Sequence, residues 1–455
     1  MDKRTVAVLG FGITGRAVLE YLLAKEPRVP LVLFNDEPVA DEDEQRSFER
    51  RGVRFLTGRR RFPELAACGS VIMSPGFDGS ESRFAELRRA GIEVISEIEF
   101  AFRQVTARFI AVSGSNGKST TVSLIHHLLC AAGRRSHLAG NIGAPLVSAL
   151  GAIEADSLVV LELSSFQLEE IVHFRPEVAV LLNITPDHLD RYPSLDAYRA
   201  AKFNLFKNQG PQDRMVLNAD DPQLRDLGTL GRGQALWFSS TRAQERGVHI
   251  ENGDLVLKLE DAGERISLRR NPLRGIHNLE NIMAAALACR TVGLPPGEIG
   301  EGLATFRGLP HRMEEAGRVG RVEFINDSKA TNVDAALKSI ASFDGNLVVI
   351  LGGKNKGGDV SPLLEPLRRA RRVLLMGQAT PLLSDRLADL GDRLLEVRDL
   401  EDAVTRAYED LREVGGVVLL APACASFDMF RNFEHRGEVF KREVGRLRRR
   451  EERHG

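Results

Sequence analysis

Short apolar runs recur along the whole chain, and longer stretches with helical periodicity separate them. Alternation of this kind is typical of doubly wound α/β folds, in which helices cover both faces of parallel sheets. The pattern falls into three successive units. We therefore expect three α/β domains, which span residues 1–97, 98–308 and 309–455.

The lengths of the apolar runs predict where the elements lie. The expected strands comprise residues 6–9, 31–34, 70–73, 109–113, 158–161, 178–182, 215–217, 322–325, 347–351, 373–376, 394–397 and 417–420. The clearest helices comprise residues 16–24, 119–130 and 278–290. Residues 230–267 alternate between apolar and polar around Gly253, which predicts an antiparallel hairpin added to the central sheet. The basic segment 441–453 is predicted to be a charged surface helix.

Polar residues gather where many of these strands end. In open parallel sheets, ligands bind outside the carboxyl ends of the strands. Such clusters follow strands of the second and third units, at residues 114–120, 162–165, 183–188, 326–329, 352–354 and 422–426. This placement predicts ligand binding along the carboxyl edges of those sheets.

The strongest motif is the glycine loop GSNGKST at residues 114–120, between an expected strand and an expected helix. A phosphate group needs backbone N–H groups at a helix N-terminus, close approach at glycine, a lysine and, for Mg²⁺, a hydroxyl group. Lys118 and Ser119 supply the lysine and the hydroxyl. The alternative is a glycine-rich turn capped by serine, but the lysine beside the serine favours an ATP site.

A second glycine turn, GFGITG at residues 10–15, follows the first strand. With Asp36 after the next strand, it matches the dinucleotide-binding pattern of a Rossmann-like domain. A tight strand-to-helix turn with close packing is the alternative. The turn indicates a phosphate-bearing ligand without indicating which one. We expect Rossmann-like N-terminal and C-terminal domains around a central mononucleotide-binding sheet of the P-loop type.

Two strand-end residues suit a metal ion. Glu162 ends a strand near the loop lysine, where a carboxylate suits a Mg²⁺ ion that bridges phosphates. A carboxylate near a helix start is the alternative. His188, beside Asp187 and Asp190, is interpreted either as a ligand or as an exposed polar residue, and its acidic neighbours favour the ligand.

Other residues carry little chemical signal by themselves. Lys202, within YRAAK, is predicted to be an ordinary lysine on a helix surface. Asn278 and Asn281 share one helix face, and they either contact a base edge or cap the helix after Gly275. Aromatic residues with helix-like spacing are predicted to lie in the core, namely Phe427, Phe430 and Phe433.

Composition narrows the class of protein. The chain has 455 residues and a formal net charge of -1, which argues against a nucleic-acid partner. The first apolar stretch is too short for a signal peptide or a membrane span. The four cysteines lack metal-ligand spacing and indicate reduced thiols in a cytoplasmic protein, at Cys68, Cys130, Cys289 and Cys424.

Together these motifs resemble the Mur ligase family, and within it the branch that adds D-glutamate. The resemblance covers nearly the whole chain and rests on GSNGKST, GNIG at 140–143, ELSSFQLE at 162–169, NITPDHLDRY at 183–192, YRAAK at 198–202, NADD at 218–221, GIHNLEN at 275–281, GLPHR at 308–312, NDSKATN at 326–332 and PACASFDMF at 422–430. The segment RNFE at 431–434 is similar to the D-glutamate branch. The sequence lacks the DNPR motif typical of the branch that adds diaminopimelate or lysine.

The resemblance implies a role for individual residues. It assigns the UDP-linked substrate to Ile13, Thr14, Asp36 or its neighbour Asn35, Gly76, Asn141 and Ser164. It assigns ATP to Gly114, Ser115, Asn116, Gly117, Lys118, Ser119, Thr120, Asn278, Asn281, Arg312 and Asp327. It assigns D-glutamate to Lys329, Thr331, Lys356 or the nearby Lys354, Ser426 and Phe433.

The same resemblance implies two Mg²⁺ ions, held by Ser119, Glu162, His188 and Lys202. Carbamylation of Lys202 by CO₂ would give that side chain a carboxylate-like end. The catalytic assignments are Lys118, His188 and Lys202.

The implied activity is that of a monomeric, ATP-dependent ligase of peptidoglycan precursor synthesis. It joins D-glutamate to UDP-N-acetylmuramoyl-L-alanine through an acyl phosphate and a tetrahedral intermediate. One alternative is a folylpolyglutamate synthase-like ligase, which shares the short glycine loop but lacks a UDP-binding unit before it. A nicotinamide-dependent dehydrogenase is another alternative, but it leaves the loop 114–120 unexplained. A P-loop switch or motor is a third alternative, but the sequence has no clear Walker B strand.

Overall fold

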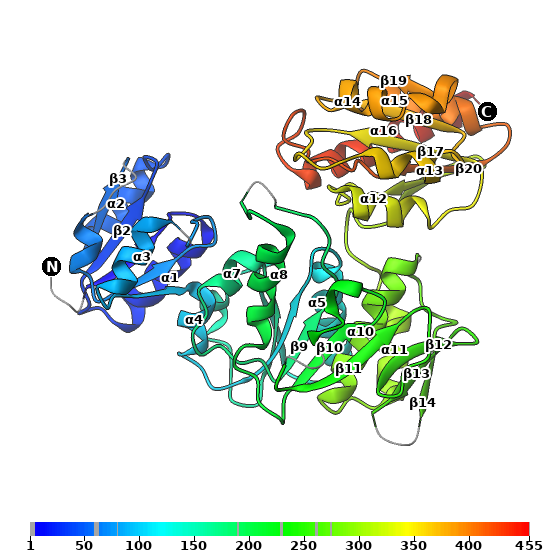
Figure 1. Ribbon diagram of the computed structural model, residues 1–455. Helices are drawn as coiled ribbons and strands as arrows, with labels where there is room; N and C mark the ends of the chain where they lie inside the picture. Colours follow the sequence, from blue (N-terminus) through cyan, green and yellow to red (C-terminus); the bar gives the residue numbers. More distant parts are fainter. Residues whose placement is uncertain are drawn as a thin grey trace. The chain divides into compact units, whose positions relative to one another are not determined.

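Three sheets with flanking helices make up the computed structural model of the protein (Figure 1). The structure describes residues 5–58, 63–79, 81–188, 191–227, 231–259, 263–273 and 275–454. Most strand pairs are parallel, which confirms the expected α/β class. Contacts divide the chain into two compact units, one of residues 1–184, 194–269 and 282–303, and one of residues 185–193, 270–281 and 304–455.

The first sheet has five parallel strands in the order β3-β2-β1-β4-β5. The strands are β1 (Val6–Leu9), β2 (Leu31–Asn35), β3 (Val53–Thr57), β4 (Ser70–Met73) and β5 (Glu93–Ser96). The helices are α1 (Ile13–Lys25), α2 (Glu42–Arg50), the 3₁₀ helix η1 (Pro63–Ala67), α3 (Ser82–Arg89) and α4 (Glu97–Phe102). Because β1 pairs with both β2 and β4, the topological switch point lies beside the glycine turn that follows β1.

The central sheet has nine strands in the order β14-β13-β12-β11-β10-β9-β6-β8-β7. They are β6 (Arg108–Ser113), β7 (Ser136–Gly140), β8 (Leu158–Glu162), β9 (Val178–Leu181), β10 (Arg214–Asn218), β11 (Gln234–Ser239), β12 (Gly247–Glu251), β13 (Asp254–Lys258) and β14 (Glu264–Ser267). Its helices are α5 (Lys118–Ala131), α6 (Leu146–Ala149), α7 (Ser165–Glu169), α8 (Leu195–Phe203), η2 (Asn204–Phe206), η3 (Pro222–Leu224), α10 (Ile276–Thr291) and α11 (Pro296–Thr305).

The expected hairpin is confirmed at β12 and β13, which pair antiparallel. Asn252 and Gly253 join them with φ angles of 54° and 81°. Two consecutive positive φ angles suit the tight turns that match strand twist. The strand pair before this hairpin, β11 and β12, is parallel, whereas the alternating segment 230–267 predicted only antiparallel pairing.

The third sheet has six strands in the order β15-β16-β20-β17-β18-β19. They are β15 (Glu314–Val319), β16 (Val322–Asn326), β17 (Leu347–Gly352), β18 (Arg372–Met376), β19 (Leu394–Glu396) and β20 (Gly416–Leu420), and only β15 runs antiparallel to its neighbour. The helices are α12 (Val333–Ile340), η4 (Ser361–Leu363), α13 (Leu364–Leu367), α14 (Thr380–Arg386), η5 (Ala388–Arg393), α15 (Leu400–Leu411) and α16 (Phe433–His454).

Alternate residues of the third sheet build a separate core on each of its faces. Val349 and Leu351 pack in the core that contains residues of α12, α13 and α14. Val348 and Ile350 pack in the core that contains residues of α15 and α16. Both faces are therefore covered, as the continuous apolar run of β17 predicts for a central parallel strand.

Four strands that the apolar runs did not predict lie at the edges of their sheets. In the first sheet β3 and β5 were missed, in the central sheet β7, and in the third sheet β15, and all four are edge strands. An edge strand has a neighbour on one side only, so parts of it face solvent and need no apolar residues. In β7, for example, Ala139 is the only fully buried residue.

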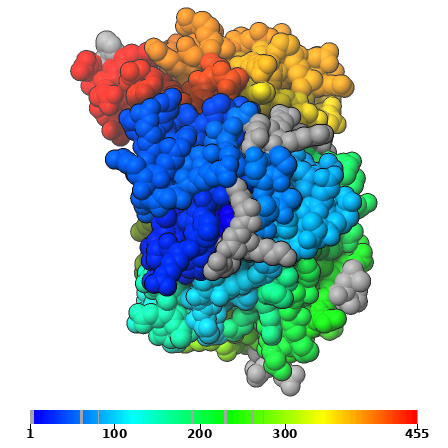
Figure 2. Space-filling view, turned by 90° about the vertical axis from the view of Figure 1, so that its left-hand side faces the viewer, coloured from blue at the N-terminus to red at the C-terminus, as the bar shows by residue number. Residues whose placement is uncertain are grey.

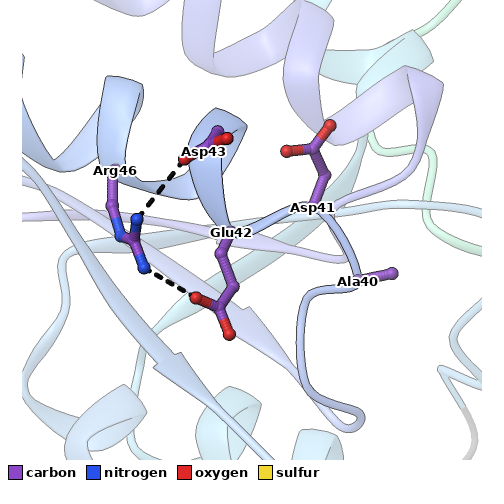
Figure 3. A pocket seen from close by; sticks show the side chains of 5 residues that line it. All are labelled: Ala40, Asp41, Glu42, Asp43 and Arg46. Carbon is purple, nitrogen blue, oxygen red and sulfur yellow. Dashed lines mark hydrogen bonds and ion pairs between the residues drawn. The ribbon is translucent and has the colours of Figure 1, made fainter.

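An open hollow lies at the start of α2 in the N-terminal domain (Figure 3; the domain is blue in Figure 2). Asp41 caps α2 by accepting a hydrogen bond from the N–H of Glu44 at 2.9 Å. Arg46 pairs with Glu42 at 2.7 Å and with Asp43 at 3.4 Å. Three carboxylates against one guanidinium leave the hollow with an excess of negative charge, which suits the N-terminus of α2. No helix in the described part of the chain is long and apolar enough to cross a membrane.

Helix α4 carries two buried glutamates whose pKa values are shifted in opposite directions. Glu97 is 2% exposed, and burial raises its pKa to about 7, although the N–H of Val147 donates to it at 2.7 Å. Burial also acts on Glu99. There, however, the backbone N–H groups of residues 172–174 and the guanidinium of Arg103 outweigh it and lower the pKa. The two carboxyl groups should therefore affect stability in opposite ways as pH changes.

We expect the E97Q variant to be more stable than the wild type at pH 8 and nearly equal to it at pH 4. The folded pKa of about 7 exceeds the ordinary value of 4.5, so the contribution of Glu97 is complete below pH 4.5 and declines as pH rises towards 7. The difference in unfolding free energy between variant and wild type should grow by roughly 3 kcal/mol over this interval. Urea denaturation followed by circular dichroism at several pH values measures it.

E99Q is the matched control for this series. The loss in unfolding free energy of E99Q relative to wild type should be largest near neutral pH and should shrink on acidification, because the pKa of Glu99 is lowered. An E97Q difference that stays constant from pH 4 to pH 8 contradicts the assignment of a raised pKa to Glu97.

Candidate active site

The glycine loop lies between the end of β6 and the start of α5, as the motif predicts. Gly114 and Gly117 have φ angles of 148° and 88°, which residues other than glycine rarely adopt. A Cβ on Gly114 would lie 3.1 Å from the Cβ of Leu182, on the neighbouring strand end. Because α5 begins at Lys118, the N–H groups of its first turn point back towards the loop. This arrangement suits a phosphate group.

The end of β9 holds this loop in place through Asn183. Its carbonyl accepts a hydrogen bond from the N–H of Ser115 at 2.9 Å. Its side chain accepts from the N–H of Asn116 at 2.8 Å and donates to the carbonyl of Asn116 at 3.1 Å. Sequence reasoning gave Asn183 no role of its own, although the polar cluster 183–188 contained it.

Two lysines converge on the carbonyl oxygens of the loop. The Nζ of Lys118 donates to the carbonyls of Gly114 at 2.8 Å and Ser115 at 2.9 Å. The Nζ of Lys202, on α8, donates to the carbonyl of Gly114 at 2.9 Å and lies 4.6 Å from the ring centre of Tyr198. The loop therefore has cationic groups from two separate helices.

The prediction that Lys202 lies on a helix surface was wrong, because only 1% of this residue is exposed. Its position in α8 places it under the glycine loop rather than in solvent. Tyr198, one turn earlier, is equally buried, and its hydroxyl lies 3.2 Å from the hydroxyl of Ser115. The sequence of α8 could not reveal which of its faces packs against the loop.

Glu162, at the end of β8, is 2% exposed, and β8 pairs with β6. One carboxylate oxygen accepts from the side-chain amide of Asn141 at 2.8 Å. The other oxygen is buried without a hydrogen-bond partner among the described residues. A buried carboxylate oxygen without a partner needs a cation or water, so it fits Mg²⁺ together with the nearby Ser119.

The described residues contain no group of three or more His, Cys, Asp or Glu side chains that could hold a metal ion. Mg²⁺ usually takes one or two carboxylates and completes its shell with water and substrate phosphates. One carboxylate and one hydroxyl beside a phosphate loop therefore agree with this preference.

His188 has a φ angle of 55°, which is uncommon for residues other than glycine. Its backbone N–H donates to the side chain of Asp187 at 3.0 Å, and 39% of its side chain is exposed. The imidazole is therefore accessible to a ligand. Asp190, the other expected neighbour, lies outside the described residues.

The glycine turn of the N-terminal domain is tightly packed. A Cβ on Gly15 would lie 1.8 Å from the carbonyl oxygen of Gly10, so only glycine fits. Ile13 is 73% exposed at the helix start, an unusual position for a large apolar side chain. Asp36, assigned to the UDP-linked substrate, forms an ion pair with Arg83 at 2.9 Å. Thr14 is half-buried and Gly76 is exposed.

Asn141 and Ser164 lie beside the ends of β7 and β8. Asn141 is exposed while its amide donates to Glu162. Ser164 caps α7 in a reciprocal arrangement with Gln167. Gly140, just before Asn141, has a φ angle of 106°, and a Cβ there would lie 2.3 Å from the carbonyl oxygen of Glu162.

The second compact unit contains the four residues assigned to ATP that lie outside the glycine loop. Asn278 and Asn281 are 5% and 4% exposed in α10, which begins at Ile276. Neither is therefore the N-cap residue, so the interpretation as helix caps was wrong. Asp327 accepts from the N–H of Met313 at 3.2 Å and from the hydroxyl of Ser339, while burial raises its pKa. Arg312 is half-buried.

Residues assigned to D-glutamate follow three strands of the third sheet. The Nζ of Lys329 lies 3.8 Å from the ring centre of Phe433, and Ser426 is 2% exposed. Thr331 is half-buried. Lys354 and Lys356 are both exposed, so the choice between them stays open.

The prediction that the three phenylalanines lie in the core was wrong for Phe427 and holds in part for Phe430. Phe427 is 71% exposed. Phe430 is half-buried and packs against the core beside α15 and α16. Phe433 is half-buried beside the ammonium of Lys329. Helical spacing did not apply, because the segment before α16 is a loop of turns.

Three family models match successive parts of the chain. The Mur ligase MurD-like N-terminal domain matches residues 4–96, the Mur ligase middle domain residues 112–289, and the Mur ligase glutamate ligase domain residues 311–424. A UDP-N-acetylmuramoylalanine--D-glutamate ligase of Geotalea uraniireducens is 40% identical over 443 residues, 96% of each chain. The Geobacter metallireducens ligase of the same name is 40% identical over 451 residues, 98% of each chain.

A solved structure shares the fold. The MurF ligase of Thermotoga maritima, in complex with ADP, superposes with a TM-score of 0.61 at 18% identity. The match covers 94% of this chain and 97% of that one.

We expect G140A to destabilise the protein by about 3 kcal/mol or more, because the added methyl group would collide with the backbone of Glu162. G133A is the matched control, since Gly133 has a φ angle of 68° but open space around its Cβ position. It should cost only about 1 kcal/mol. Equal losses for the two variants in thermal denaturation would show that crowding at Glu162 is unimportant.

Proposed function

The chain belongs to the Mur ligase family, and we propose that it joins D-glutamate to UDP-N-acetylmuramoyl-L-alanine with conversion of ATP to ADP and phosphate. Relatives named for this reaction match nearly the full length. The observation that carries the proposal is the glycine loop beside Glu162, whose buried carboxylate oxygen has no partner in the described part of the chain.

We assign the domains by their site residues. Residues 1–97 bind the UDP-linked substrate, residues 98–308 bind ATP, and residues 309–455 bind D-glutamate. The exposed Ile13 at the switch point of the first sheet supports the first assignment. The phosphate loop supports the second, and lysines at the carboxyl edge of the third sheet support the last.

The protein's residues suit a reaction through an acyl phosphate. The N–H groups of the glycine loop and the ammonium of Lys118 hold the phosphates of ATP for in-line attack by the alanyl carboxylate. Mg²⁺, held by Ser119 and Glu162, neutralises phosphate charge when bound. The amine of D-glutamate then attacks the acyl carbon, and phosphate leaves from the tetrahedral intermediate. Lysines of the third domain hold the carboxylates of D-glutamate.

Rival functions explain fewer observations. A folylpolyglutamate synthase-like enzyme does not account for the match of residues 4–96 to a MurD-like N-terminal domain. A nicotinamide-dependent dehydrogenase leaves the loop beside Glu162 without a use. We also propose that the protein acts in the cytoplasm as a monomer; the lack of a disulfide at its four cysteines supports the cytoplasmic location.

Phosphate release tests the function directly. We expect turnover with ATP, UDP-N-acetylmuramoyl-L-alanine and D-glutamate, and none when D-glutamate is replaced by meso-diaminopimelate or D-alanyl-D-alanine. K118A should reduce kcat by about a thousandfold, because it removes a charge that contacts the transferred phosphoryl group. Phosphate release that is independent of D-glutamate would exclude this function.

K207A is the control for the loss of a lysine. The Nζ of Lys207 also donates to a backbone carbonyl, that of Ile171 at 3.3 Å, but none of the assigned site residues is involved. This variant should keep kcat within about twofold of wild type. Equal losses in K118A and K207A would overturn the role of the glycine loop.

We further propose that CO₂ carbamylates Lys202 and that the product, with His188, serves a second Mg²⁺ ion. The burial of Lys202 beside the phosphate loop supports this role. Protein incubated with ¹³C-bicarbonate should show a carbamate carbon signal in NMR spectra. The signal should disappear in K202R and persist in K207R. Identical spectra for wild type and K202R would rule out the modification at this residue.

A further inference from the structure

We propose that Arg436 is the positioning residue of the D-glutamate site, because its buried guanidinium ties together the three loops that carry the assigned D-glutamate residues. This inference rests on the proposed function. Arg436 lies in the first turn of α16 and is only 1% exposed, the largest of the fully buried side chains in the described structure.

Every N–H group of this guanidinium has an acceptor on a strand-end loop. The Nε donates to the hydroxyl of Ser328 at 2.9 Å, and Nη2 donates to the carbonyl of the same residue at 2.8 Å. Nη1 donates to the carbonyl of Gly352 at 3.3 Å, and both Nη atoms donate to the carbonyl of Cys424 at 3.2 Å. An arginine has five N–H donors in a planar fork, and all five are used here.

The sheet order explains why one side chain reaches three loops. β20 lies between β16 and β17, and all three strands are parallel. Their carboxyl ends therefore lie side by side and lead into the loops of Ser328, Gly352 and Cys424. The same loops carry Lys329 and Thr331, the lysines at 354 and 356, and Ser426.

Further contacts make these loops one assembly. Gly353 has a φ angle of 131°, and a Cβ there would lie 2.1 Å from the carbonyl oxygen of Ala425 and 3.1 Å from Nη1 of Arg436. The N–H of Lys354 donates to the carbonyl of Ala425 at 2.8 Å, and the reverse bond is 3.0 Å. The hydroxyl of Ser328 also donates to the carbonyl of Phe433 at 2.9 Å.

The positive charge of Arg436 is stabilised by the dipoles of backbone carbonyls and of one hydroxyl group rather than by a carboxylate. Burial lowers its pKa to about 10, so it remains a cation at neutral pH. No carboxylate of the described residues forms an ion pair or hydrogen bond with it. Asp428, whose charge raises the pKa of Arg436, accepts a hydrogen bond from the N–H of Gln378 at 2.8 Å instead. A positive potential therefore remains beneath the loops, which favours an acceptor with two carboxylates.

The conservative variant R436K tests the proposal in the full-length enzyme. A lysine keeps the charge but has three donors instead of five and lacks the planar fork. We expect KM for D-glutamate to rise by about tenfold or more, while KM for ATP and for the UDP-linked substrate changes by less than about twofold. S328A, which removes one acceptor, should raise the same KM by a smaller factor and serves if R436K does not fold.

R372K is the matched control in the same sheet. Arg372 begins β18 and pairs with Asp410 at 2.8 Å, at the amino end of the strands and away from the loops. It should lower thermal stability without changing KM for D-glutamate. The proposal is overturned if R436K keeps the wild-type KM for D-glutamate, or if it raises all three KM values alike.

Hydrogen exchange separates this proposal from the proposed function, because it needs no substrate. In R436K, amides of residues 327–332, 352–357 and 423–427 should exchange faster than in wild type, and in R372K they should not. Unchanged exchange in R436K overturns the positioning role whatever the enzyme acts on. If wild type does not use D-glutamate but the loops respond as expected, the proposed function fails while the loop assembly stands.

Discussion

The carboxyl edge of the central sheet depends on backbone contacts that are too close for any side chain. At Gly140, a Cβ would lie 2.3 Å from the carbonyl oxygen of Glu162, and the N–H of Asn141 donates to that same oxygen at 2.8 Å. The contact holds the ends of β7 and β8 together. It thereby directs the side chain of Asn141 to the carboxylate of Glu162, and leaves one oxygen of that carboxylate without a partner in the described structure.

Charged groups buried at the strand ends are solvated by backbone dipoles. The ammonium of Lys202 donates to a loop carbonyl, and the guanidinium of Arg436 donates to carbonyls and one hydroxyl. When an acid forms an ion pair with a buried cation, the two charges largely cancel in their effect on distant groups. Carbonyl dipoles also stabilise a buried cation, but they carry no net charge, so the positive charge of the cation remains. The guanidinium of Arg436 therefore remains able to attract the carboxylates of a substrate.

The central and third sheets use the same topological principle in different ways. In the central sheet, β6 lies between β8 and β9, so the glycine loop meets Glu162 on one side and Asn183 on the other. In the third sheet, β20 lies between β16 and β17, and its loop is linked to both neighbours by Arg436. In both sheets, strands that lie side by side are far apart in the sequence, because parallel strands are joined by crossover connections.

Local sequence was enough to predict the α/β class, most inner strands, the hairpin of β12 and β13 and the phosphate loop, because each depends on local periodicity or on residues within one short motif. It missed the edge strands β3, β5, β7 and β15, whose partial exposure weakens the apolar pattern, although it predicted the edge strand β19. Only the tertiary structure decided that Lys202 and Arg436 are buried. Their partners lie 88 and 108 positions away, and the periodicity of a helix says nothing about what packs against its faces.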